Sequence, residues 1–118
     1  MSFVLDQILR EVIFEGPETI SSQWYSEYFD ISGTEDDFAV ILTYDNGSAV
    51  EMTLKLQYSN DLTNWFDVDG SSQAIVDDSG AHMWDIGSSS ATFCRVSIEV
   101  TAGSIDLTRI QFDGKRRH

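Results

Sequence analysis

The chain has 118 residues, 42% of them hydrophobic, which fits one folded domain with a core of its own. Its 20 acidic and 7 basic residues give a formal net charge of −13, and such a surface repels nucleic acid, whose binding depends on Lys and Arg. No apolar run approaches the roughly 18 residues of a membrane helix. The single cysteine, Cys94, excludes an internal disulfide. We therefore expect neither nucleic acid nor a membrane as a partner.

The N-terminal residues fit two structures. Apolar residues recur at helical spacing from Val4 onward, whereas "EVIF" (11–14) also fits a first strand. We predict an arm or short helix over residues 1–9, then a strand that ends at Gly16-Pro17. Charged residues interrupt the apolar segment that a signal peptide needs, so we expect production in the cytoplasm.

Alternating patterns predict the next three strands. In "WYSEYFDI" (24–31) the inward residues are Tyr25, Phe29 and Ile31. "FAVILTY" (38–44) is apolar on both faces and is placed centrally. "VEMTLKLQY" (50–58) alternates cleanly, with its apolar residues on one face. Between the last two, Asn46-Gly47 predicts a tight hairpin turn, because both residues accept positive φ.

The remaining strands are predicted at 72–76, 81–86, 94–100 and 104–112. Cys94 falls on the inward face of its strand and is expected to be a core residue. In the last strand the apolar face changes, which a bulge near Thr108 or Arg109 would explain. The fold class is all-β: a single antiparallel β-sandwich, jelly-roll or Ig-like, of about eight strands over residues 10–113, followed by a basic tail at 114–118.

The pattern of titratable residues indicates no catalytic, cofactor or metal site. The two histidines, His82 and His118, stand apart from any Cys/His metal spacing, and no serine lies in a nucleophile elbow. Acidic clusters at 35–37, 67–69 and 77–78 would suit calcium, but solvated turns are the preferred interpretation in so acidic a chain. We expect a protein that is not an enzyme.

Trp65 leaves two interpretations open. In "SNDLTNW" the Asn60 and Asp61 side chains can bond their own backbone in a turn, after which Trp65 begins the returning strand. We favour a Trp65 that packs over the end of the sandwich. The alternative is a carbohydrate platform whose contact residues are Tyr58, Trp65 and Asp67.

The stretch "LQYSNDLTNWFDV" resembles the (V/L)-x-x-SNDGTNW-x-x-(L/V) hairpin of small β-sandwich proteins from bacteriophage particles. "CRVSIEVTAGSIDLTRI" is similar to the arginine-bearing strand, Gly-containing turn and closing strand of the same proteins. The resemblance spans roughly residues 8–112 and is close only at 54–68 and 94–108. Leu62 departs from it, because the pattern has glycine there. Similar hairpins occur in discoidin-like carbohydrate-binding modules.

The resemblance implies a non-enzymatic virion protein, as a capsid decoration, head–tail, or tail and fibre module. We expect docking onto a major capsid or tail protein and self-association into a homo-oligomer, in the virion, after production in the host cytoplasm. The expected interface residues are those of the arm and tail with Leu62: Phe3, Val4, Leu5, Leu62, Lys115, Arg116 and Arg117. The alternative function is a discoidin-like carbohydrate-binding module, such as one on a tail fibre.

Overall fold

The computed structural model describes residues 6–32, 35–87 and 90–117, and in these residues the chain forms eight β-strands. They are β1 (Asp6–Ile20), β2 (Gln23–Tyr25), β3 (Phe29–Asp30), β4 (Glu35–Ser59), β5 (Phe66–Asp67), β6 (Gln73–Ile75), β7 (Gly80–Ile86) and β8 (Phe93–Arg117). Every pairing is antiparallel, which confirms the all-β class. The described residues contain no helix with the length and apolarity needed to cross a membrane.

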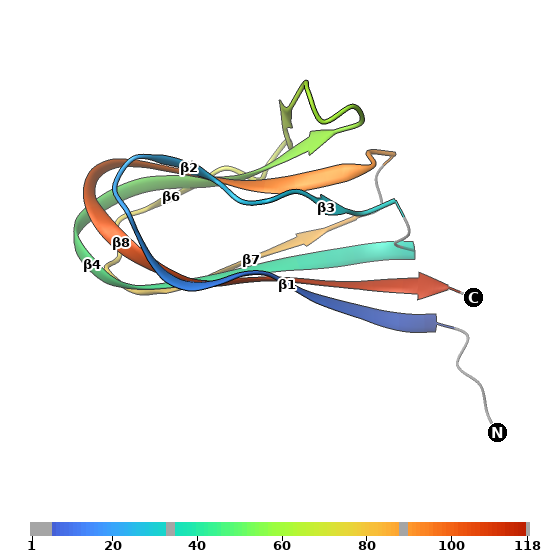
Figure 1. Cartoon of the computed structure of the whole chain (residues 1–118), viewed down its shortest axis with the longest axis horizontal. Coiled ribbons are helices and arrows are strands. Elements are labelled where there is room, and N and C mark those ends of the chain that lie inside the picture. Colours follow the sequence, from blue (N-terminus) through green and yellow to red (C-terminus); the bar gives the residue numbers. More distant parts are fainter. Residues whose placement is uncertain (1–5, 33–34, 88–89, 118) are drawn as a thin grey trace.

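The strands form two layers because β4 and β8 bend over at one end of the molecule, and the chain between β1 and β2 follows the same bend (Figure 1). The first layer has the order β1, C-terminal half of β8, N-terminal half of β4, β7. The second has β2 and β3, then the other halves of β8 and β4, then β5 and β6. This is the strand arrangement of a jelly roll, one of the two predicted forms of sandwich.

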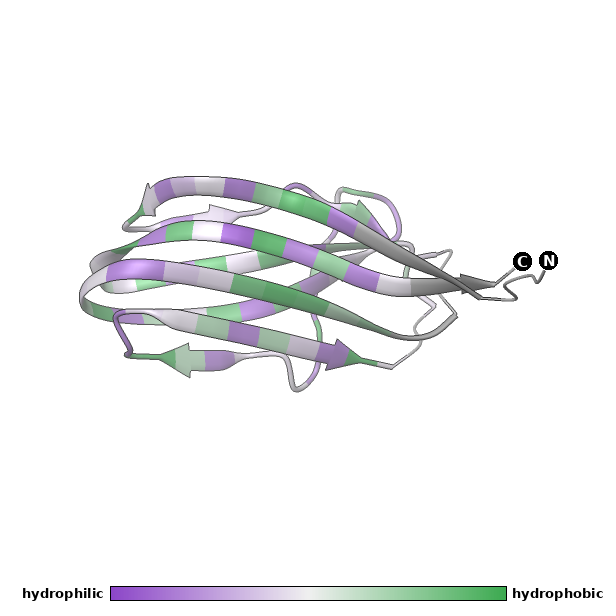
Figure 2. Ribbon diagram, turned by 90° about the horizontal axis from the view of Figure 1, so that it is seen from below, coloured by the Kyte–Doolittle hydropathy of each residue, from purple (hydrophilic) through white to green (hydrophobic). Residues whose placement is uncertain are grey.

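Hydropathy alternates along the long strands (Figure 2), and their apolar side chains are buried between the layers. The side chains with no exposed surface are Val40, Leu42, Leu54, Leu56, Cys94, Val96, Ile98, Ile105, Leu107, Ile110 and Phe112. The predicted inward faces of 50–58 and 94–100 are confirmed, with Tyr58 only half-buried. Burial raises the pKa of the Cys94 thiol, so this cysteine stays protonated and unreactive.

The predicted strand at 24–31 is interrupted, and one of its inward residues was assigned wrongly. Phe29 and Ile31 are buried as expected, but Tyr25 is 46% exposed. The strand breaks at Ser26, whose hydroxyl accepts the backbone N–H of Val96 at 2.9 Å. That side-chain bond replaces part of the strand ladder and separates β2 from β3.

The tight hairpin predicted at Asn46-Gly47 is also wrong. The flanking segments 38–44 and 50–58 both pair with β8 and do not pair with each other. Asn46 has the expected positive φ of 53°, yet residues 46–49 carry β4 around a corner from the first layer into the second. The predicted positive φ is present at Asn46 but not at Gly47, and the hairpin role assigned to the pair was wrong.

At this corner the backbones of neighbouring strands approach each other more closely than side chains would allow. A Cβ on Gly103 of β8 would lie 2.1 Å from the Ser48 carbonyl oxygen, and Gly103 has φ +72°. A Cβ on Gly47 would lie 2.6 Å from the backbone of Asp78, whose carbonyl accepts the Gly47 N–H at 2.7 Å. Glycine is therefore required where β4 and β8 turn together.

Two further features complete the corner. The Asp106 carboxylate of β8 accepts hydrogen bonds from Thr19 at 2.7 Å and Asn46 at 3.0 Å, so it joins β1 and β4. Gly16-Pro17, expected to end the first strand, instead lies within β1, where the register shifts between Glu15 and Glu18. The single proline therefore occupies a strand irregularity, where its missing N–H costs no ladder bond.

The predicted bulge in the last strand is confirmed. Thr43 pairs with Arg109 and Tyr44 with Leu107, so Thr108 is the extra residue. The Thr108 hydroxyl donates to the Thr43 carbonyl at 2.9 Å. The bulge allows apolar residues on both sides of Thr108 to face the core.

The two ends of the described chain pair with each other. Asp6–Leu9 belong to β1 and lie opposite residues 114–117 of β8. In the described part, the segments expected as an arm or short helix and as a basic tail are therefore strand. Residues 1–5 and 118 lie outside the described residues, as do the expected interface residues Phe3, Val4 and Leu5.

Two glycine substitutions distinguish the cost of a positive φ from the cost of steric overlap. Gly103 lies at the corner, and Gly70 lies in open space. Gly70→Ala should cost about 1–2 kcal/mol, because Gly70 has φ +77° but nothing lies within 4 Å of the position that the alanine methyl group would take. Gly103→Ala should cost clearly more, since the methyl group also overlaps the Ser48 carbonyl. Urea unfolding of both variants measures the difference. Equal losses would contradict the proposed role of the corner.

Candidate functional site

The turn at residues 59–65 is held by its own side chains. The Asp61 carboxylate accepts hydrogen bonds from the backbone N–H groups of Asn64 at 2.8 Å and Thr63 at 2.9 Å, and from the Asn64 amide at 2.8 Å. These bonds hold the pKa of Asp61 well below its ordinary value. The Ser59 hydroxyl accepts the backbone N–H of Leu62 at 2.9 Å. The predicted Asx turn is therefore present at Asp61.

Asn60 and Leu62 have different roles from Asp61. The Asn60 amide oxygen accepts the backbone N–H of Thr92 at 2.8 Å and so ties the turn to the segment before β8. Leu62 has φ 63° and is 39% exposed. Leu62 therefore takes a left-handed conformation, which glycine adopts most readily, and presents an apolar side chain to solvent.

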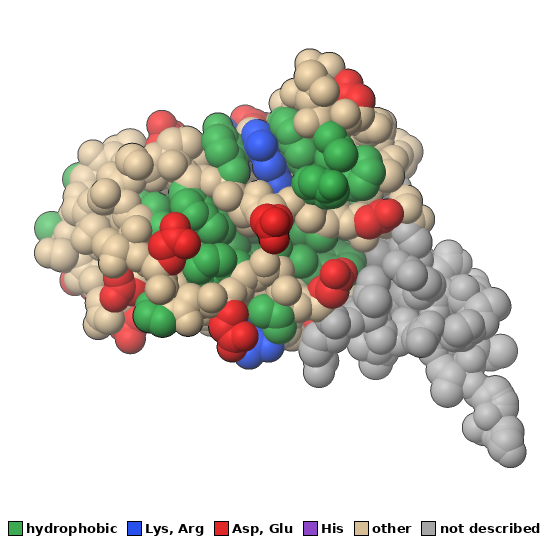
Figure 3. Space-filling view, in the orientation of Figure 1, with side chains coloured by type: hydrophobic (Ala, Val, Ile, Leu, Met, Phe, Trp, Pro, Cys, Tyr) green, Lys and Arg blue, Asp and Glu red, His purple; other side chains and the backbone are tan. Residues whose placement is uncertain are grey.

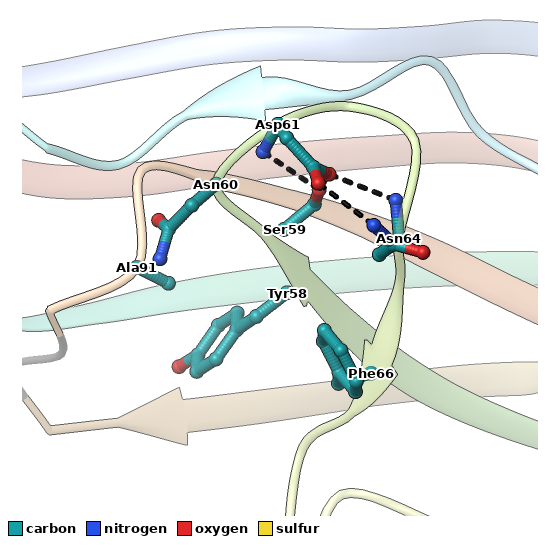
Figure 4. A pocket seen from close by; sticks show the side chains of 7 residues that line it. All are labelled: Tyr58, Ser59, Asn60, Asp61, Asn64, Phe66 and Ala91. Carbon is teal, nitrogen blue, oxygen red and sulfur yellow. Dashed lines mark hydrogen bonds between the residues drawn. The ribbon is translucent and has the colours of Figure 1, made fainter.

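Tyr58 and Phe66 line an open hollow of about 270 Å³ beside this turn. The two residues are cross-strand partners of β4 and β5, and their rings lie near each other below the turn (Figure 4). Phe66 is 68% exposed, whereas Tyr58 packs partly against the core.

Trp65 neither belongs to the core nor closes the end of the sandwich. It is half-buried on the outer side of the second layer, where the guanidinium carbon of Arg95 lies 4.3 Å from its ring centroid. The same carbon lies 3.9 Å from the ring centroid of Tyr25. The Arg95 guanidinium is therefore stacked between two aromatic rings, a cation–π arrangement that fixes all three side chains.

Polar side chains continue outward from this stack across β8, β4 and β5. The Arg95 Nε donates to the Gln57 amide oxygen at 2.8 Å, and the Gln57 nitrogen donates to Asp67 at 2.9 Å. Lys55 forms an ion pair with the other Asp67 oxygen at 3.1 Å. The Gln57 hydrogen bond, with Lys55 as the smaller influence, lowers the pKa of Asp67.

A second hollow, of about 380 Å³, is lined by Ser26, Glu27, Tyr28, Trp65 and Arg95. On the face drawn in Figure 3, a Lys or Arg side chain lies between two groups of hydrophobic side chains, with acidic side chains around them. The three residues expected from the sequence to contact a carbohydrate do not lie together. Trp65 lines this hollow, Tyr58 lines the hollow beside the turn, and Asp67 lines neither. Arg95 and Tyr25 were missed.

The outer face of the first layer carries an apolar row, which we define as Val12, Ile41 and Met83. Gln111 pairs with both Val12 and Ile41, and Ile41 pairs with Met83, so the row crosses the layer with the polar Gln111 between Val12 and Ile41. Met83 is 57% exposed and Val12 45%. The neighbouring rows contain charged residues, namely Asp85 and Asp113 on one side and Arg109 and Glu15 on the other.

Titratable side chains also line a third hollow, of about 250 Å³, in the described part of the chain, namely Glu11, Glu27 and Asp30. No group of three or more His, Cys, Asp and Glu side chains among the described residues could hold a metal ion. His82 stacks edge-on against Trp84 with ring centroids 4.6 Å apart, and burial lowers its pKa. The Lys115, Arg116 and Arg117 backbone pairs with β1.

No family model and no curated protein matches the sequence. Among solved structures, the SPBc2 prophage-derived protein YomS superposes with a TM-score of 0.58 at 13% identity, covering 98% of both chains. VP2 of infectious bursal disease virus, solved as a subviral particle, gives 0.62 at 8% identity over 95% of this chain and 33% of VP2. A family 35 carbohydrate-binding module from Clostridium thermocellum gives 0.51 at 10% identity, covering 91% and 90%.

These likenesses show the fold. The chain is a β-sandwich of a kind that a prophage-derived protein and a viral particle protein share, and that a carbohydrate-binding module shares as well. The chain spans about a third of VP2.

Replacing Asp61 with Ala should loosen the turn at 59–65. The amide protons of Thr63 and Asn64 should exchange faster, because they lose their acceptor, while those of β4 stay protected. Asp69→Ala is the control, since Asp69 is an exposed aspartate outside this hydrogen-bonded turn. Unchanged exchange at both amides would show that the backbone alone holds the turn.

The hydrogen bonds to Asp61 also predict how the stability of the turn changes with pH. Because the pKa of Asp61 is lower in the folded protein than in the unfolded chain, its stabilisation is complete above about pH 4 and is lost as pH falls through the folded value. The turn should therefore stay protected at pH 5 and open only in strong acid.

Proposed function

We propose that the chain is a non-enzymatic structural protein of a bacteriophage particle, which docks through the outer face of its first layer. The observation that carries the docking role is the apolar row of Val12, Ile41 and Met83. An apolar centre with a charged rim is the usual composition of a protein–protein interface. The full-length likeness to prophage-derived YomS and the likeness to VP2 support the viral setting.

The surface occupying this row is a second copy of the chain or a major capsid or tail protein. The acidic exterior keeps free subunits soluble and favours a partner with basic residues at the rim. In this role the protein is produced in the host cytoplasm and then becomes part of the virion.

Met83→Lys should weaken docking at least tenfold, because it puts a charge at the most exposed residue of the apolar row. Stability should change by less than about 0.5 kcal/mol, since the side chain is exposed. Light scattering across a concentration series measures self-association. Mass spectrometry of purified particles of the encoding phage measures incorporation.

Val76→Lys is the matched control, because Val76 is 71% exposed and lies outside the row. It should leave association and incorporation unchanged. Particles that contain no trace of the chain would refute the virion role. Full incorporation of Met83→Lys would refute the docking face.

The second candidate is a carbohydrate-binding module, and the specific observation behind it is the hollow beside Trp65 and Arg95. Exposed aromatic rings next to hydrogen-bonding groups are suited to sugar rings, and the fold is similar to that of a family 35 module.

Trp65→Ala should abolish binding on a glycan array if this second function is correct. Thermal unfolding should change only modestly, because Trp65 lies outside the core. Phe66→Ala is the control, since it removes an exposed ring from the other hollow. A steep loss of stability in Trp65→Ala would instead assign this tryptophan a structural role.

A further inference from the structure

We propose that the hollow at Arg95 binds a sugar residue that carries a single carboxylate. This inference rests on the second candidate function and adds the chemical class of the ligand. It is independent of the docking face on the first layer.

The first argument is the fixed position of the Arg95 guanidinium. Its two faces are covered by Tyr25 and Trp65, and one edge is bonded to Gln57 through Nε. Gln57 is in turn held by Asp67. An arginine restrained in this way loses little further conformational entropy when it binds a ligand.

The second argument is the unused hydrogen-bonding capacity of Arg95. Within the described residues, no carboxylate pairs with it and Gln57 is its one hydrogen-bond partner, although the chain contains 20 acidic residues. A guanidinium has five N–H donors, so the terminal nitrogens are available to an occupant of the hollow that Arg95 lines. Their planar arrangement matches a carboxylate, which takes two parallel hydrogen bonds.

The rest of the lining favours a sugar over an acidic peptide. Tyr28 and Trp65 offer aromatic surface against which the apolar face of a sugar ring packs. Glu27 lines the same hollow, and its carboxylate accepts hydrogen bonds from ring hydroxyls. Glu27 and the net charge of −13 repel a ligand with several negative charges more strongly than one with a single carboxylate. A hydroxylated ring with one carboxylate can pair with Arg95, donate hydrogen bonds to Glu27 and pack against the aromatic rings.

The test is calorimetric titration of the whole chain with three disaccharides that share one scaffold. They end in glucuronic acid, in its methyl ester, and in glucose. The acid should bind about tenfold or more tightly than the ester, since only the acid pairs with Arg95 as an anion. A short Asp/Glu-rich peptide is titrated in parallel and should not bind.

Two variants test whether the ligand binds at Arg95. Arg95→Lys keeps the charge but lacks the planar fork, so it should lose the preference for acid over ester. Arg109→Gln, which removes an exposed arginine of the same strand on the other layer, should keep that preference. If Arg95→Lys does not fold, the comparison of acid with ester on the unmodified chain still tests whether the carboxylate is recognised.

The outcomes separate this inference from the function on which it rests. Equal binding of acid, ester and glucose forms would overturn the carboxylate specificity and leave the carbohydrate function standing. Binding of none of the three would overturn both. Binding of the acidic peptide alone would overturn the sugar and make the hollow a docking point for protein.

Discussion

The structure depends on the close contact of backbones at the bend where β4 and β8 turn together. Each of these strands belongs to both layers, so the bend sets the register of both layers at once. Gly103 and Gly47 permit the contact because a side chain at either position would overlap a neighbouring backbone. Asp106 adds hydrogen bonds to Thr19 and Asn46 at the same place. The bend therefore determines the positions of both outer faces and of the two candidate sites on them.

The sequence predicted the local structure wherever side chains alternate. The inward faces of 50–58 and 94–100 and the bulge at Thr108 followed from apolar spacing, because one buried face constrains every second residue. The layer crossing at 46–49 could not be predicted in this way. Asn46-Gly47 has the same local preference in a hairpin and in a corner, and only pairing with β8, some 50 residues later, distinguishes the two.

The candidate sites also differ in how far the sequence could predict them. The Asp61 turn was predictable, because its hydrogen bonds join residues three apart or fewer. The stack of Tyr25, Arg95 and Trp65 was not, since its members come from three distant segments. The outward position of Arg95 was visible in the alternation of its strand. Which rings would cover it was decided by the order of strands in the second layer, where β2 and β8 are neighbours.

The pairing of β1 has a consequence for how the chain folds during synthesis. In the described structure β1 has one neighbouring strand, the C-terminal half of β8, which is synthesised after the other seven strands. Until then β1 has no partner for its backbone N–H and C=O groups, while β4 and β7 can already associate. The first layer is therefore completed only after β8 has been synthesised, and the unpaired β1 is the segment that a chaperone or a neighbouring nascent chain would meet.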